Sequence, residues 1–199
     1  MSSILKVDEI QDTSGNNIIN ENANTITIGK SGDTVNLASG ATNNLGITEA
    51  DAWRITTNTV FSSSGTSDVT ANWERADTDG FDKIGTGLSE SSGIFSFPST
   101  GYYYINHFSS TNAAAARDYT SMQLKITLDN SSYGNATSNY GNIAGANYLS
   151  SNTASFIVKV TDISNIKFKF EVQRSDTFTL LGSTSESRSG FSCIRLGDI

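Results

Sequence analysis

The stretch Ser92-Gly-Ile-Phe-Ser-Phe-Pro-Ser-Thr-Gly-Tyr-Tyr-Tyr-Ile-Asn-His-Phe108 decides how the rest of the chain is interpreted. Phe95 and Phe97 alternate with their neighbours at the two-residue period of a β-strand. Pro98, the only proline of the chain, ends this strand, and Gly101 begins a second one that is rich in tyrosine. The stretch therefore predicts two strands hinged at a turn.

Large aromatic side chains occur on both faces of these two strands. Each face is therefore expected to pack against something, one against the protein core and the other against a neighbouring subunit. Tyrosine is common at such interfaces because its ring is apolar and its hydroxyl can reach a partner. The residues predicted to form this subunit interface are Phe95, Phe97, Tyr102 and Tyr104.

The spacing Gly-x-Phe-x-x-Pro-x-x-Gly-x-Tyr-x-Ile resembles the strand signature of the complement-type globular head, a tumour-necrosis-factor-like (TNF-like) jelly roll. The matching residues are Gly93, Phe95, Pro98, Gly101, Tyr103 and Ile105. The resemblance covers about residues 51–199. It implies a jelly-roll β-sandwich that assembles as a homotrimer.

The composition excludes several classes of protein. A net charge of −7 argues against binding to a phosphate backbone, so no nucleic-acid partner is expected. Cys193 is the only cysteine, which rules out a disulfide within the chain. No apolar run is long enough for a membrane span, and the first residues do not resemble a secretory signal. We expect synthesis in a cytoplasm and no membrane insertion.

Residues 1–50 differ from the rest of the chain. Leu5, Val7 and Ile10 form a short apolar alternation that can be ordered only against a neighbour, so we interpret them as an anchor. The segment 25–29 is echoed nine residues later by 34–38, which indicates a β-rich trimeric or solenoid stalk or, as the plainer alternative, a hairpin. The predicted domains are an anchor and stalk over residues 1–50 and a head over residues 51–199.

The first 16 residues also resemble the start of tail-fibre and virion-attached proteins of marine bacteriophages. Thr25-Ile-Thr-Ile-Gly29 and Ser31-Gly-Asp-Thr-Val35 are similar to the stalk repeats of those proteins. The resemblance spans about fifty residues. It implies attachment through the N-terminus to another virion protein of the capsid, portal or tail.

The head sequence is predicted to be all-β. Residues 122–129 and 166–173 alternate apolar and polar side chains, as expected for strands with one buried face. Residues 130–147, rich in Gly, Asn and Ser, are predicted to be a long loop. About eight to ten strands and no helix are expected, which fits a jelly roll.

Catalytic chemistry is not expected, and the chain is predicted not to be an enzyme. The sole histidine, His107, is interpreted as a packing residue, and Cys193 as a buried inert thiol. Asp77, Asp79 and Asp82 raise the question of calcium, but the spacing fits no helix-loop-helix site and a solvated turn is favoured. No cofactor or metal is predicted.

The residues that remain for recognition are tyrosines surrounded by Asn, Gly and Ser. Tyrosine supplies contact area at low entropic cost, and the small polar residues supply adaptable hydrogen bonds. Such a composition suits a protein contact or the stacking of a sugar ring. It is equally compatible with loops that pack their own aromatics. The predicted ligand-binding residues are Tyr133, Asn135, Tyr140, Asn142 and Tyr148.

These observations predict a phage virion structural protein, located on the virion surface. It would be a trimeric fibre or spike whose outward head binds a glycan or protein of the host cell surface. Three weak sites on each trimer would act through avidity. One alternative is a capsid decoration protein, a head fibre or cement without its own receptor. A polysaccharide depolymerase tip is less well supported, because the sequence does not place two carboxylates on one groove.

Overall fold

The computed structural model describes residues 46–78 and 82–199. The predicted anchor and nearly all of the predicted stalk, including Leu5, Val7 and Ile10, lie outside the described residues. The described ranges contain thirteen strands and no helix. The strands are β1 (Ala50–Ile55), β2 (Thr59–Phe61), β3 (Gly65–Asp68), β4 (Trp73–Arg75), β5 (Ser89–Ser91), β6 (Ile94–Ser96), β7 (Gly101–Asn112), β8 (Arg117–Thr127), β9 (Tyr133–Ile143), β10 (Leu149–Val160), β11 (Lys167–Arg174), β12 (Phe178–Leu180) and β13 (Gly190–Gly197).

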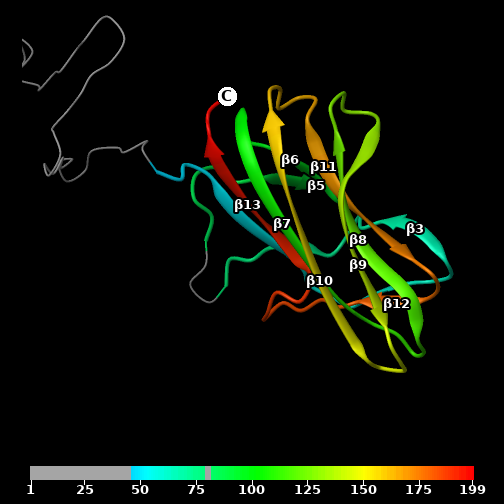
Figure 1. The fold of residues 1–199 in the computed structure, drawn as a ribbon. Coiled ribbons are helices and arrows are strands. Elements are labelled where there is room, and N and C mark those ends of the chain that lie inside the picture. Colours follow the sequence, from blue (N-terminus) through cyan, green and yellow to red (C-terminus); the bar gives the residue numbers. More distant parts are fainter. Residues whose placement is uncertain (1–45, 79–81) are drawn as a thin grey trace, which may run out of the picture. The chain divides into compact units, whose positions relative to one another are not determined.

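The strands form two antiparallel sheets that stack as a sandwich (Figure 1). The seven-stranded sheet has the order β2-β12-β7-β13-β1-β4, and β10 also pairs with β7, along its whole length from Gly101 to Asn112. The six-stranded sheet has the order β5-β6-β11-β8-β9, and β3 pairs with β11. The all-β prediction is confirmed. The strand number exceeds the expected eight to ten because several strands have only three or four residues.

The stretch from Ser92 to Phe108 passes from one sheet to the other. Its two strands form as predicted, but they do not pair with each other. β6 pairs with β5 and β11, whereas β7 pairs with β10, β12 and β13. Pro98 lies at the crossing, where its missing N–H costs no sheet hydrogen bond. The turn therefore connects the two layers.

The backbone requires glycine at two positions of the Gly-x-Phe-x-x-Pro-x-x-Gly spacing. Gly93 has a φ of 80° and Gly101 a φ of 146°, a backbone region that residues with a side chain rarely adopt. A Cβ on Gly93 would lie 2.3 Å from the Val69 carbonyl oxygen, and one on Gly101 would lie 2.6 Å from the Gly197 carbonyl oxygen. Only glycine fits at both positions.

The two ends of the sandwich differ. At one end, here called the terminal end, the Arg195 backbone N–H donates to the Glu49 carbonyl, and its guanidinium contacts Thr48. The C-terminus lies at this end, close to the start of β7 (Figure 1). The opposite end, here called the loop end, carries the β7–β8 and β9–β10 connections, residues 113–116 and 144–148. The chain therefore enters and leaves the described head at one end.

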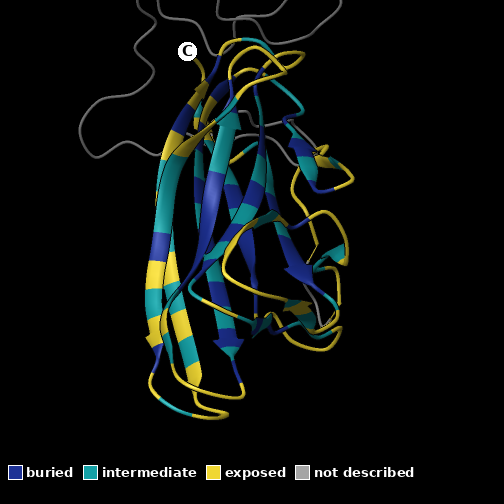
Figure 2. Ribbon diagram, turned by 90° about the vertical axis from the view of Figure 1, so that its right-hand side faces the viewer, coloured by how far each residue is buried: buried dark blue, intermediate teal, exposed yellow. Residues whose placement is uncertain are grey.

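The interior changes character along β7. Nearest the terminal end, its inward side chains are Tyr103 and Ile105; farther along they are His107 and Thr111. Burial alternates along these strands, with buried residues in dark blue (Figure 2). The first part of the interior is an aromatic cluster, defined as Trp53, Phe95, Phe168, Phe170 and Phe191. The second part is a polar layer, defined as His107, Ser109, Thr111, Thr120 and Asn139.

Candidate functional site

Two of the four residues predicted for the trimer interface lie inside the single chain. Phe95 is fully buried and Phe97 is 3% exposed. Phe95 meets Phe191 at a ring-centroid distance of 4.8 Å, and Phe97 meets Tyr103 at 4.7 Å. The assignment of Phe95 and Phe97 to an interface is therefore wrong. Phe95 and Phe97 are two positions apart on an extended segment, so their side chains point to the same side, into the sandwich.

Tyr102 and Tyr104 lie on the outer face of the seven-stranded sheet. In the register, Tyr104 lies between Ile157 of β10 and Ile194 of β13. Ile157 is 57% exposed and Tyr102 is 38% exposed, while Tyr104 and Ile194 are half-buried. We call Tyr102, Tyr104, Ile157 and Ile194 the apolar band.

A groove continues from the apolar band at the edge of the sandwich. It lies between the start of β9 and the end of β10 and has a volume of about 320 Å³. Its apolar walls include Ile126, Leu128 and Phe156, and it shares Ile157 with the band. Leu128 is 72% exposed. Contiguous exposed apolar surface of this kind is typical of protein interfaces.

The predicted loop over residues 130–147 is mostly a strand. Tyr133–Ile143 forms β9, an edge strand that pairs with β8. The prediction was wrong because strands were recognised by alternating apolar and polar residues. An edge strand needs little such alternation, and the Gly, Asn and Ser residues of β9 do not show it. The predicted ligand residues consequently fall on a strand and in the turn after it.

The structure does not bring the five predicted ligand residues together. Tyr133 and Asn135 lie at the start of β9, in register with Thr127 and Lys125. Tyr140 and Asn142 lie toward the loop end of the same strand, and Tyr148 lies in the β9–β10 connection with 62% of its surface exposed.

Tyr140 is part of a cluster that sequence reasoning missed. Its hydroxyl donates to Gln173 Oε1 at 2.5 Å, and Gln123 Nε2 lies 3.0 Å from that hydroxyl. Gln123 Nε2 also donates to Gln173 Oε1 at 2.6 Å. The Tyr119 ring meets the Tyr140 ring at 6.2 Å and 68°. These residues come from β8, β9 and β11. The only signal in the sequence was that Gln123 and Gln173 occupy polar, outward positions in two segments that alternate apolar and polar residues.

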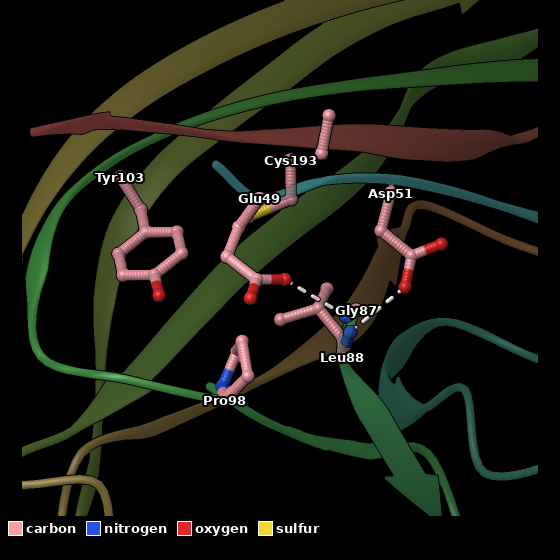
Figure 3. A pocket seen from close by; sticks show the side chains of 8 residues that line it. Glu49, Asp51, Gly87, Leu88, Pro98, Tyr103 and Cys193 are labelled. Carbon is pink, nitrogen blue, oxygen red and sulfur yellow. Dashed lines mark hydrogen bonds between the residues drawn. The ribbon is translucent and has the colours of Figure 1, made fainter. Parts of the chain in front are cut away.

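The carboxylates near the terminal end serve the fold (Figure 3). Glu49 accepts the backbone N–H of Gly87 at 2.9 Å, and Asp51 accepts that of Leu88 at 2.8 Å. Asp51 is buried and also accepts two hydrogen bonds from Arg75, whose pKa is raised chiefly by this contact. The cavity beside them holds only about 10 Å³. Their lone pairs anchor the segment before β5, and this cavity is too small for a substrate.

The Cys193 thiol and the His107 imidazole, the nucleophilic and basic groups considered from the sequence, are both buried. Burial raises the pKa of the Cys193 thiol far above its ordinary value, so the thiol is protonated and unreactive. Burial lowers the pKa of His107 to about 4, so the ring is neutral near pH 7. Its Nδ1 lies 3.4 Å from Asn139 Nδ2. Both placements agree with the packing roles expected from the sequence.

In the described parts of the chain, no three His, Cys, Asp or Glu side chains are grouped so that they could hold a metal ion. Asp79, one of the three carboxylates raised for calcium, lies outside the described residues. Over residues 46–78 and 82–199, no helix has the length and apolar character needed to cross a membrane.

Comparison with known proteins supports the fold. No protein-family model and no curated protein sequence matches the chain. The structure of murine APRIL at pH 5.0 aligns with a TM-score of 0.55 at 9% identity, covering 74% of this chain and 98% of that chain. Eiger TNF from S. frugiperda aligns with a TM-score of 0.55 at 14% identity, covering 75% and 93%. At this identity the likeness concerns the fold, and the predicted TNF-like jelly roll is confirmed.

Proposed function

We propose that the protein is a homotrimeric, non-catalytic attachment protein of a phage particle, with the jelly roll as its outward binding head. The main support for a trimer is the apolar band and its continuation into the groove at the β9–β10 edge. The band lies on the outer face of the seven-stranded sheet and the groove lies at the β9–β10 edge, and Ile157 belongs to both. A contact of the band of one copy with the edge of the next is head-to-tail, and such contacts form a ring when the rotation from one copy to the next closes.

Light scattering on the purified full-length chain tests the trimer. We expect a mass of three chains over a range of concentrations. Ile157→Asp places a charge in the middle of the band and should yield monomers. Val60→Asp is the matched control, because Val60 is also an exposed aliphatic residue on a strand, with 61% exposure. A wild-type monomer, or equal behaviour of the two variants, would refute this interface.

The location on a phage rests on the resemblance of residues 1–50 to virion-attached fibres. Immunogold electron microscopy with an antibody against the head should label purified virions and show whether the label lies on the capsid or the tail. Deletion of residues 1–16 should leave a trimeric head that is absent from the particles. Continued incorporation of the deletion variant would contradict the anchor assignment.

Binding of the labelled trimer to host cells distinguishes an adhesin from a decoration protein. An adhesin should bind the bacterial strain on which the phage grows, and monomeric Ile157→Asp should bind much more weakly because avidity is lost. A cement or head fibre without its own receptor should be incorporated into virions and bind no cells.

A further inference from the structure

The outer face of the six-stranded sheet carries a surface whose chemistry is unlike that of the apolar band. Toward the loop end it presents Tyr119 and Tyr140 beside the amides of Gln123 and Gln173. We call these four residues the tyrosine–glutamine shelf. We propose that the shelf binds a neutral sugar ring of a surface polysaccharide. This proposal rests on the proposed function, because it names the ligand of the binding head.

The shelf is held in place before any ligand arrives. The Tyr140 hydroxyl and Gln123 Nε2 both donate to Gln173 Oε1, at 2.5 and 2.6 Å. Gln123 is 2% exposed although it lies on an outer face, so its side chain is fixed by its neighbours. Tyr140 nevertheless keeps 55% of its surface exposed. A fixed but exposed aromatic ring loses little entropy on binding.

The hydrogen-bonding capacity of the shelf is not used up within the described residues. Gln173 Oε1 is engaged twice, while the Gln173 amide nitrogen makes no hydrogen bond to them. Ser121 lies in register between Tyr140 and Gln173 and is 3% exposed, and its hydroxyl also lacks a partner there. A buried polar atom without a partner is uncommon and points to a missing ligand or water. A sugar hydroxyl can accept a hydrogen bond from the Gln173 amide nitrogen, whereas the Ser121 hydroxyl is enclosed beneath the shelf.

The shape of the shelf suits a sugar. The two rings meet at 68°, so they form a corner in which one ring face is approached by the edge of the other. A hexose has an apolar C–H face and a rim of hydroxyls. The C–H face can pack on an aromatic ring while the rim reaches the amides, as in small-molecule sites with a few placed polar groups.

The charges around the shelf favour a neutral ligand. Toward the terminal end, Lys125 is paired with Glu171 at 3.2 Å and Lys169 with Asp68 at 2.6 Å. Toward the loop end, Arg117 lies 3.8 Å from the Asp176 carboxylate. Each of these three cations therefore faces a carboxylate of the chain, which reduces its attraction for an anionic polymer. The overall charge of −7 acts in the same direction. The shelf lies on the sheet opposite the apolar band, so one molecule can use both surfaces.

Calorimetric titration of the full-length trimer tests the proposal. The probes are maltohexaose, cellohexaose and laminarihexaose as neutral ligands, with a polygalacturonate oligomer as the anionic comparator. We expect binding of at least one neutral probe and none of the anionic one. Tyr140→Ala should lower the affinity by about tenfold or more, and Tyr140→Phe by less, because Phe keeps the ring and loses the hydroxyl.

Tyr148→Ala is the matched control, since Tyr148 is 62% exposed, similar to Tyr140, but lies in the β9–β10 turn. It should leave the affinity unchanged, and all variants should remain trimeric by light scattering. Loss of binding in Tyr148→Ala but not in Tyr140→Ala would overturn the shelf, as would preference for the anionic probe or no binding of any probe. Host-cell binding that survives Tyr140→Ala would refute the shelf while leaving the attachment function in place.

Discussion

The aromatic cluster and the polar layer fill neighbouring parts of one sandwich interior by different means. In the aromatic cluster, contacts such as Phe95–Phe168, at 5.1 Å between ring centroids, depend on volume and shape. In the polar layer, side chains such as Thr111 and Asn139 depend on particular partners, as Thr111 does on the Thr120 hydroxyl at 3.2 Å. The comparison teaches that the same strands can continue past an apolar core if the next layer is paired by hydrogen bonds. The two parts should therefore respond differently to cavities, pH and loss of a partner.

The largest effect is expected from a cavity in the aromatic cluster. Phe95→Ala removes a fully buried ring that contacts Trp53, Phe168 and Phe191. The free energy of unfolding should fall by about 3–5 kcal/mol. Urea unfolding followed by tryptophan fluorescence measures this. Tyr148→Ala, at an exposed aromatic residue, is the control, and a loss for Phe95→Ala as small as that of the control would contradict the assignment of the core.

The polar layer should make stability depend on pH. His107 has a folded-state pKa of about 4, below its ordinary value of 6.5, because it is buried. The unfolded chain therefore binds the proton more tightly, and stability should fall as pH drops from 6.5 to 4, by on the order of 3 kcal/mol. Above pH 6.5 this contribution is fully present, and below pH 4 it is lost.

His107→Gln removes this titrating group, and the chain has no other histidine. Urea unfolding midpoints measured at several pH values should show a flatter slope between pH 6.5 and 4 for the variant. Identical slopes for the variant and the wild type would mean that other groups cause the acid sensitivity. A ring titration by NMR near pH 6.5 in the folded protein would contradict the buried environment.

A smaller loss is expected at Asn139. Its Oδ1 accepts the Met122 backbone N–H at 2.7 Å, and its Nδ2 donates to the Asn152 carbonyl at 3.3 Å. Asn139→Leu keeps the volume but leaves the Met122 N–H without its partner, which should cost about 1–3 kcal/mol. Asn135→Ala, on an exposed position of the same strand, should change stability by less than about 0.5 kcal/mol in urea unfolding. Equal effects of the two variants would refute the role of the pairing.

The smallest effect concerns the Thr111–Thr120 pair. Thr111→Val leaves the Thr120 hydroxyl without its partner and should cost about 1 kcal/mol. The double variant Thr111→Val/Thr120→Val removes both groups and should cost less than the sum of the two single variants. Additive losses in the double-mutant cycle would show that the two hydroxyls do not depend on each other.

The sequence predicted the strands that border the aromatic cluster better than those that border the polar layer. In residues 122–129 and 166–173, the alternating apolar and polar residues match the side chains that point inward and outward on β8 and β11. β9 was missed because its inward positions include Asn139 and Thr137, which look like loop residues without knowledge of their partners. The strands on either side of Pro98 were recognised, but their separation into two sheets depends on pairings with distant segments.

The candidate sites were predictable only in part. Tyr102, Tyr104 and Tyr140 were identified from composition, whereas Gln123 and Gln173 were not. These two amides lie fifty positions apart and meet only because β8 and β11 pair. Tyr133 and Tyr148 were grouped with Tyr140 because they are near in sequence, although the length of β9 separates them. Local composition indicates which residue types are available, and strand order decides which of them meet.

The contact between Thr48 and Arg195 at the terminal end has a consequence for the order of the strands. Because the two ends of the head lie side by side, a short linker can join residue 199 to residue 46 without crossing the sandwich. New termini can then be placed in the exposed loop at Ser185–Glu186. Such a circular permutant keeps every strand pairing and changes only the sequence in which the strands are synthesised. The jelly roll is thus defined by which strands are neighbours, and chain order is one of several routes to it.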